Sequence, residues 1–269
     1  MIKKTILYLL IVMMSIPAFS QEYYVRDKKE VDSATFMIWG SPNFSVQLPF
    51  GQGYLAKTFN YNLNFGVDIT IKTQSNWTID IAFNYMFGSK VSLTPRELLG
   101  DMSLTDSILA VLNSAGNNKV PLAYEGRYWY LGTTVGKVFP IDRWKNSGFW
   151  LKVGAGYFEH KIHFTDPNNY FPQIDQRDYR LGYDRHSQGV ALNQFFGYMF
   201  MQKRRVLSFY LGVEVWEIFT KPDRGYIFVG QLAGPTDTRP LKFSGLLGFK
   251  LGWILPFYEK NRVTTYYYY

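Results

Sequence analysis

The chain has 269 residues, a formal net charge of +8 and an aromatic content of 19%. It has no cysteine, which excludes disulfide frameworks, thiolate metal sites and cysteine nucleophiles. It also has no phosphate-binding glycine loop and no zinc-binding helix motif, so the sequence predicts no cofactor.

The first twenty residues predict export. Lys3 and Lys4 precede an apolar run, and Pro17 leads into small residues before Gln21. This is the pattern of a secretory signal peptide at 1–20, and its apolar run is shorter than the ~20 residues of a membrane span. An uncleaved anchor is the alternative. In an exported protein the basic balance does not indicate nucleic acid as a partner.

Apolar and polar residues alternate over 59–72, with Phe, Tyr, Leu, Val and Ile on one parity and mostly Asn, Asp, Thr and Lys on the other. A period of two over this length predicts a strand rather than a helix. An earlier segment at about 35–48 also alternates, but Pro42 makes it the least regular. The sequence predicts eight strands, at about 35–48, 59–72, 77–87, 128–139, 149–164, 190–201, 206–219 and 241–255.

The connections between these strands alternate in length. Those at 73–76, 140–148 and 202–205 are short, and the others are longer. Short turns on one side and long loops on the other are typical of an outer-membrane barrel with both termini in the periplasm. The sequence therefore predicts an all-β fold, an eight-stranded antiparallel transmembrane β-barrel over 34–258, preceded by a periplasmic segment at 21–33. Outer-membrane lipid and lipopolysaccharide would surround it.

A soluble β-sandwich is the alternative to the barrel. Its strands would be shorter, and its outer face would be polar. In the barrel, the polar parity faces a lumen that side chains fill. Because isolated buried charges are costly, we expect a plug of ion pairs and hydrogen bonds rather than a conducting pore. The predicted plug residues are Asp68, Lys72, Asp80, Lys152, Glu214, Lys242 and Lys250.

The second long connection predicts a helix in the outer loop at about 94–114. Thr94 suits an N-cap, Pro95 suits the first turn, and Glu97 completes a capping box. Apolar residues then recur at helical spacing, and such a face must be buried. It either packs over the barrel mouth or binds a neighbouring protein. The residues predicted for a partner contact are Leu104, Ile108 and Leu112.

All three histidines are predicted to lie near the outer rim, where Ser, His and carboxylates serve catalysis in some barrel enzymes. His160 and His163 belong to the fifth strand, and His186 precedes the sixth. No serine stands in a recognisable nucleophile context. His160 and His163 are three residues apart, which places them on opposite faces of a strand. The histidines are therefore weak candidates for a metal or catalytic site, and the sequence predicts no enzyme.

The chain closes with a polar stretch and four tyrosines, at 259–269. Tyrosine offers rigid contact area and a polar handle, which suits a binding site. A periplasmic tail that exposes so much aromatic surface predicts a protein partner. A disordered or membrane-adsorbed end is the alternative. The tail residues are Tyr266, Tyr267, Tyr268 and Tyr269.

Over nearly all of the mature length, the chain resembles small outer-membrane barrels of the Bacteroidota. The likeness lies in the "AFSQ" junction, the "SNW" turn, "GWILPFY" in the last strand and the tyrosine end. The resemblance carries over no catalytic residues. It implies an accessory subunit of an envelope machine, such as barrel assembly or protein secretion and gliding.

The functional expectation is a non-enzymatic outer-membrane barrel that acts as a scaffold or accessory subunit of a protein assembly or secretion complex. It would hold protein partners through the helical loop on one side and the tyrosine tail on the other. Two alternatives remain open. One is an enzyme that acts on lipid or peptide at the histidine rim, and the other is a narrow pore or adhesin.

Overall fold

The computed structural model describes residues 34, 36–51, 55, 59–88, 110–112, 119–121, 123–141, 144–165, 181, 183–201, 208–223 and 241–257. The predicted signal peptide, the segment 21–33 and the tail 259–269 lie outside these residues, as do Leu104 and Ile108. Among the residues that the structure describes, no helix is long and apolar enough to cross a membrane.

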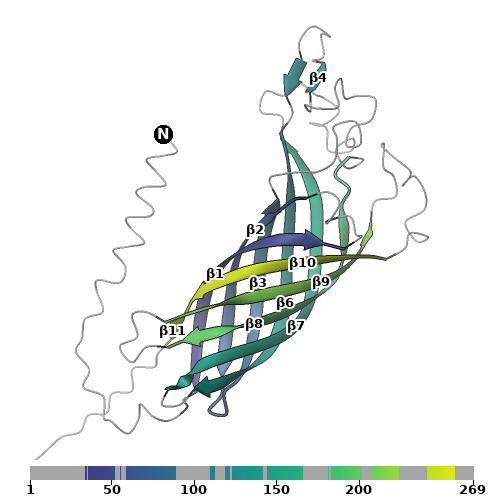
Figure 1. Ribbon diagram of the computed structural model, residues 1–269. Helices are drawn as coiled ribbons and strands as arrows, with labels where there is room; N and C mark the ends of the chain where they lie inside the picture. The colour runs from purple at the N-terminus through teal and green to yellow at the C-terminus, as the bar shows by residue number, and fades with distance from the viewer. Residues whose placement is uncertain are drawn as a thin grey trace, which may run out of the picture.

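The long strands form one antiparallel ring (Figure 1). The strand order is β10-β9-β8-β7-β6-β3-β2-β1, and β10 pairs with β1 to close it. A short strand, β11 (Leu255–Phe257), continues the line of β10 and also pairs with β1. The eight strands are β1 (Met37–Phe50), β2 (Asn62–Lys72), β3 (Trp77–Gly88), β6 (Ala123–Ile141), β7 (Trp144–Thr165), β8 (Ser187–Phe200), β9 (Phe209–Pro222) and β10 (Lys242–Trp253).

The two ends of the barrel differ, and we name them by their connections. At the turn end, β2 and β3 are joined by 73–76, where Asn76 adopts φ 65° and its N–H donates to the carbonyl of Thr73 at 3.0 Å. Asn tolerates this left-handed conformation better than most residues. At the loop end, β6 and β7 extend beyond the other strands, as Figure 1 shows. Both are longer than the sequence predicted.

Pro42 lies within β1, opposite Val67 of β2. Proline has no N–H, so a central strand normally excludes it. On its other side, β1 pairs with β10 from Asn43 onward and with β11 only up to Gly40. Pro42 therefore sits where the neighbouring strand is interrupted, and no ladder hydrogen bond to that neighbour is lost.

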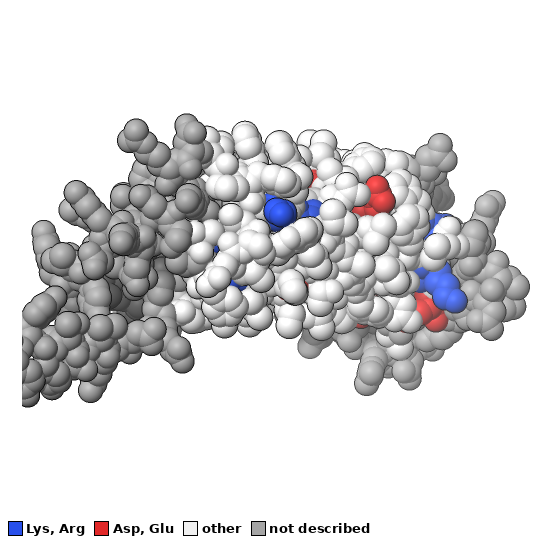
Figure 2. All heavy atoms as spheres, turned by 90° about the horizontal axis from the view of Figure 1, so that it is seen from below, with Lys and Arg blue, Asp and Glu red and all other residues white. Residues whose placement is uncertain are grey.

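The side chains alternate between an outward apolar face and a polar or aromatic lumen. On β2, Phe65, Val67, Ile69 and Ile71 are between 42% and 52% exposed, whereas Asp68 is fully buried. Figure 2 shows one side of the molecule, where uncharged atoms predominate and charged side chains form isolated spots. A soluble sandwich would not expose such a face. A closed ring of this kind satisfies its backbone internally, which is the condition for crossing a bilayer with strands.

The predicted helix at 94–114 is only partly tested, because most of it lies outside the described residues. At its end the prediction is wrong: Ala110–Leu112 form strand β4, which pairs with β5 (Lys119–Pro121). Val111 lies directly opposite Val120, and β-branched residues favour paired strands over helices. Leu112 therefore belongs to a hairpin.

Candidate functional site

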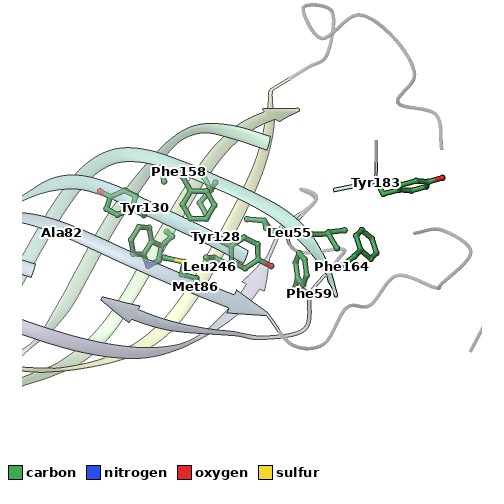
Figure 3. Close-up of a cluster of buried hydrophobic side chains, with 14 residues drawn as sticks. Leu55, Phe59, Ala82, Met86, Tyr128, Tyr130, Phe158, Phe164, Tyr183 and Leu246 are labelled. Atoms are coloured by element: carbon green, nitrogen blue, oxygen red, sulfur yellow. The ribbon is translucent and has the colours of Figure 1, made fainter. Parts of the chain in front are cut away.

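The lumen near the loop end is filled by aromatic and aliphatic side chains (Figure 3). Tyr128 and Tyr130 of β6 are fully or almost fully buried. The Tyr130 ring meets Trp216 edge-on, with centroids 4.7 Å apart, and Tyr128 stacks on Phe158 at 6.3 Å. These ring contacts fill much of the cross-section of the lumen at this level.

On the turn-end side of these rings, Lys152 of β7 lies between two carboxylates. Its Nζ is 2.5 Å from Asp80 Oδ2 and 3.6 Å from Asp68 Oδ2. Thr134 donates a hydrogen bond to the same Asp80 oxygen at 2.6 Å. Tyr210 donates to Asp68 Oδ2 at 3.3 Å. All these side chains are buried, so each charge depends on its partners for stability.

A second cation, Lys250 of β10, completes the network. Its Nζ lies 3.7 Å from Asp68 Oδ2 and 3.7 Å from Glu214 Oε2. The other Glu214 oxygen accepts hydrogen bonds from Ser45 at 2.5 Å and from Gln47 at 2.6 Å. Because its members come from β1, β2, β3, β6, β7, β9 and β10, the network ties nearly the whole ring together across the lumen.

A second aromatic cluster lies in the lumen near the turn end. It contains Trp39, Trp150, Phe195 and Tyr210, all at most 3% exposed. The Trp150 indole N–H donates to Thr78 Oγ1 at 3.0 Å, and Lys152 Nζ lies 4.4 Å from the Trp150 ring centroid. The charged middle is thus covered by packed rings on both sides.

Two of the predicted plug residues lie apart from this network. Lys72 is buried near the turn end, where its Nζ donates to Asn146 Oδ1 at 3.0 Å. Lys242 is half-buried at the loop end of β10, opposite Thr220. The other five, Asp68, Asp80, Lys152, Glu214 and Lys250, are brought together.

At the loop-end rim, the His186 ring is held between two carboxylates. Its Nε2 lies 2.7 Å from Glu159 Oε1, and its Nδ1 lies 2.6 Å from Asp223 Oδ1. The Asp223 N–H donates to the His186 carbonyl at 3.3 Å. A neutral imidazole has one N–H, so both contacts are hydrogen bonds only when the imidazole is protonated or a carboxyl carries a proton. This clasp joins β7 to the residue just before β8 and the residue just after β9.

The other two histidines do not join the clasp. His160 points into the lumen, 1% exposed, with its Nε2 3.1 Å from Thr220 Oγ1. His163 lies on the opposite face of β7, across from Glu125 of β6. The parity argument from the sequence is therefore correct for this pair.

The rim geometry does not resemble a hydrolytic triad. In such a triad, the histidine nitrogen remote from the orienting carboxylate faces a hydroxyl nucleophile. Here Glu159 occupies that position. Ser187 is adjacent in sequence, but its hydroxyl donates to the Arg185 carbonyl at 3.3 Å. Among the described residues, no group of three or more His, Asp or Glu side chains could hold a metal ion.

Tyr183 lies beside this rim, and burial raises the pKa of its hydroxyl.

The sequence did not point to Glu159 or Asp223 as partners of His186. Asp223 is 37 positions away and follows a different strand, so only the register of the closed ring brings it close. Glu159 adjoins His160 in the sequence, yet its partner is the histidine of the next strand.

No family model and no curated protein sequence matches this chain.

The comparison with solved structures finds small outer-membrane barrels. The chain is similar to Ail of Yersinia pestis in complex with the heparin analogue sucrose octasulfate, at 11% identity and a TM-score of 0.39, over 82% of this chain and 99% of that one. Neisserial surface protein A matches at 7% identity and a TM-score of 0.40, over 80% and 96%. The outer membrane protein AlkL matches at 14% identity and a TM-score of 0.34, over 91% and 100%.

These likenesses are weak, and the assignment of the fold stands on the chain's own geometry. The ring is closed by β1 and β10, its outward face is apolar, and its lumen is polar in the middle. The chain forms a closed, eight-stranded antiparallel β-barrel with an apolar outer face.

Proposed function

We propose that this protein is a non-enzymatic scaffold or accessory subunit of an outer-membrane protein assembly or secretion complex, with both termini in the periplasm. The observation that carries the proposal is the filled lumen. Packed rings cover an ion network that links seven of the ring's strands, so the interior serves rigidity rather than passage of a substrate. Binding must then occur on the outside of the barrel, at its loops or at its tail.

The enzyme alternative finds little support at the rim. An acyl-transfer site needs a nucleophile within hydrogen-bond reach of its base. Both nitrogens of His186 face carboxylates instead, which suits a structural clasp. A pore is disfavoured because both ends of the charged level are covered by aromatic side chains. A surface adhesin also fits a filled lumen, and the following experiment separates it from a subunit.

The test is purification of the tagged protein from its native outer membrane in mild detergent. A second preparation uses a chain that ends at Tyr258, and a tagged barrel of similar size serves as control for non-specific capture. We expect other envelope proteins at fixed stoichiometry with the full chain, and loss of at least one of them on truncation. A lone barrel in both preparations would contradict the proposal. An enzyme at the histidine rim and a surface adhesin would then be the leading alternatives.

A further inference from the structure

Two polar side chains interrupt the lipid-facing surface on one side of the barrel. Gln194 of β8 and Glu217 of β9 occupy outward positions, with Leu192 and Phe196 flanking the first and Val215 and Phe219 the second. Gln194 is exposed and Glu217 is half-exposed. The two lie on adjacent strands, because Gln194 pairs with Val215 and Leu192 pairs with Glu217. They form one polar spot in an apolar band.

The depth of this spot follows from the aromatic side chains on the same strand. On β9 the outward aromatics are Phe209 near the turn end and Phe219 near the loop end, ten positions apart. At ~3.3 Å per residue and a tilt of ~40°, that spacing is about 25 Å, the height of an apolar band. Glu217 then lies about 5 Å inside the loop-end aromatic level, and Gln194 lies deeper still.

The opposite side of the barrel lacks such residues. Among the described outward positions of β1, β2 and β3 between the aromatic levels, all are apolar, proline or glycine. The large ones are Phe44, Val46, Leu48, Phe65, Val67, Ile69, Ile79, Ile81 and Phe83, each at least 36% exposed. On β6 the outward, exposed Thr133 lies opposite Ile81, so the uniformly apolar side is the face of β1 and β2. A carboxylate and an amide set the polar spot apart from that face.

Lipid is a poor neighbour for these groups. A charged side chain facing the hydrocarbon is destabilising in a depth-dependent way, and polar side chains in a membrane usually bond to another protein segment. Within the described part of the chain, Glu217 forms no ion pair, and its cross-strand neighbour on β10 is Gly245. The Phe50 ring covers Gly245, since a Cβ there would lie 2.2 Å from Phe50 Cζ. No basic side chain of the band reaches Glu217.

We propose that the outward face of β8–β10 around Gln194 and Glu217 is a lateral docking surface, and that its partner is a membrane-embedded protein segment carrying an arginine or lysine opposite Glu217. Charge complementarity identifies the partner class. A second copy of this chain that presents the same face fits less well, because the described outward band of β8–β10 between the aromatic levels carries no lysine or arginine. This inference rests on the proposed function and specifies which face of the subunit meets its complex.

The test places a photo-reactive amino acid at Leu192 or at Leu247, which flank the spot, and at Val67 on the apolar side as the matched control. Val67 lies between Pro42 and Phe83. Cross-linking is carried out in the native outer membrane. We expect one discrete protein adduct from Leu192 and Leu247 and only lipid adducts from Val67. The cross-linked partner segment should contain an arginine or lysine. Lipid adducts alone at all three positions would overturn the proposal, and so would an adduct with a second copy of this chain.

The charge is tested separately. Glu217→Lys should reduce the Leu192 adduct at least tenfold, and Glu217→Gln should reduce it by less. Heat-dependent gel migration confirms that each variant still forms a barrel. Should Glu217→Lys fail to fold, the isosteric Glu217→Gln decides the comparison. An unchanged adduct in the folded variants would refute the role of the carboxylate.

The two failures are distinguishable. If partners co-purify with the full chain but the face contacts only lipid, the docking surface is wrong and the accessory-subunit function stands. If the barrel is also alone after purification, the function itself is contradicted.

Discussion

Replacement of Lys152 by methionine should destabilise the barrel strongly. The change keeps most of the side-chain volume but removes the cation that lies 2.5 Å from Asp80 and 3.6 Å from Asp68. Asp80 would keep only its hydrogen bond from Thr134, and it would be left as a buried, uncompensated charge. Removing one partner of a buried ion pair costs about 3–5 kcal/mol. The unfolding equilibrium constant should therefore rise by about two to four powers of ten.

The assay is reversible denaturant unfolding of the barrel in lipid vesicles, followed by tryptophan fluorescence and by heat-dependent gel migration. Lys137→Met is the surface control. Its Nζ lies 4.8 Å from the Trp77 ring centroid, and loss of such an exposed contact costs about 1 kcal/mol or less. The double variant Lys152→Met, Asp80→Asn should recover part of the loss because the unpaired carboxylate is gone. A free energy of unfolding for Lys152→Met within 1 kcal/mol of the original protein would refute the reasoning.

Three further predictions concern the lumen and the rim. Gly156→Val should block barrel formation, because a Cβ there would lie 2.4 Å from the Leu131 carbonyl oxygen and 2.5 Å from Gly132 Cα. Ala155→Val, on the outward face, should fold normally. The folded fraction on unheated gels measures both variants, and equal folding would count against the close approach of β6 and β7 at Gly156. His186→Asn should loosen the rim without unfolding the barrel, because it removes the contacts with Glu159 and Asp223. Amide hydrogen exchange at the start of β8 should rise about tenfold relative to His163→Asn, in line with the ~1.5 kcal/mol or more that a charged hydrogen bond contributes. Unchanged exchange would show that these contacts do not stabilise the rim. The purified protein should show no ion conductance in planar bilayers, and regular single-channel steps would contradict the filled lumen.

The sequence predicted the ring of strands well, because the alternation of apolar and polar residues directly shows which side chains face outward and which face the lumen. Along β2, Asp68 and Ile69 are neighbours with opposite environments, one fully buried and the other 52% exposed. The parity of a strand shows such a difference without any knowledge of its partners. Charges of the middle level, such as Asp80 and Glu214, were identified for the same reason.

What alternation does not encode is which lumen residues meet. Lys152 and Asp80 are joined only by the register of β3, β6 and β7, and Lys242 shares the polar parity but lies beyond the network. The Glu159–His186–Asp223 clasp likewise depends on three strands meeting at the rim.

The segment Ala110–Leu112 illustrates a different limit. Its apolar residues fit a helical period, but pairing with Lys119–Pro121 provides the backbone partners of a strand instead. Short apolar stretches fit either period, and tertiary context decides between them.

The mass of the intact particle released from native outer-membrane vesicles tests the central claim most directly. If the barrel is a subunit that binds its partners on its outer surface, native mass spectrometry should find one dominant particle that contains this chain and other envelope proteins in a fixed ratio. A particle with the mass of the single barrel, carrying lipid adducts only, would contradict the account.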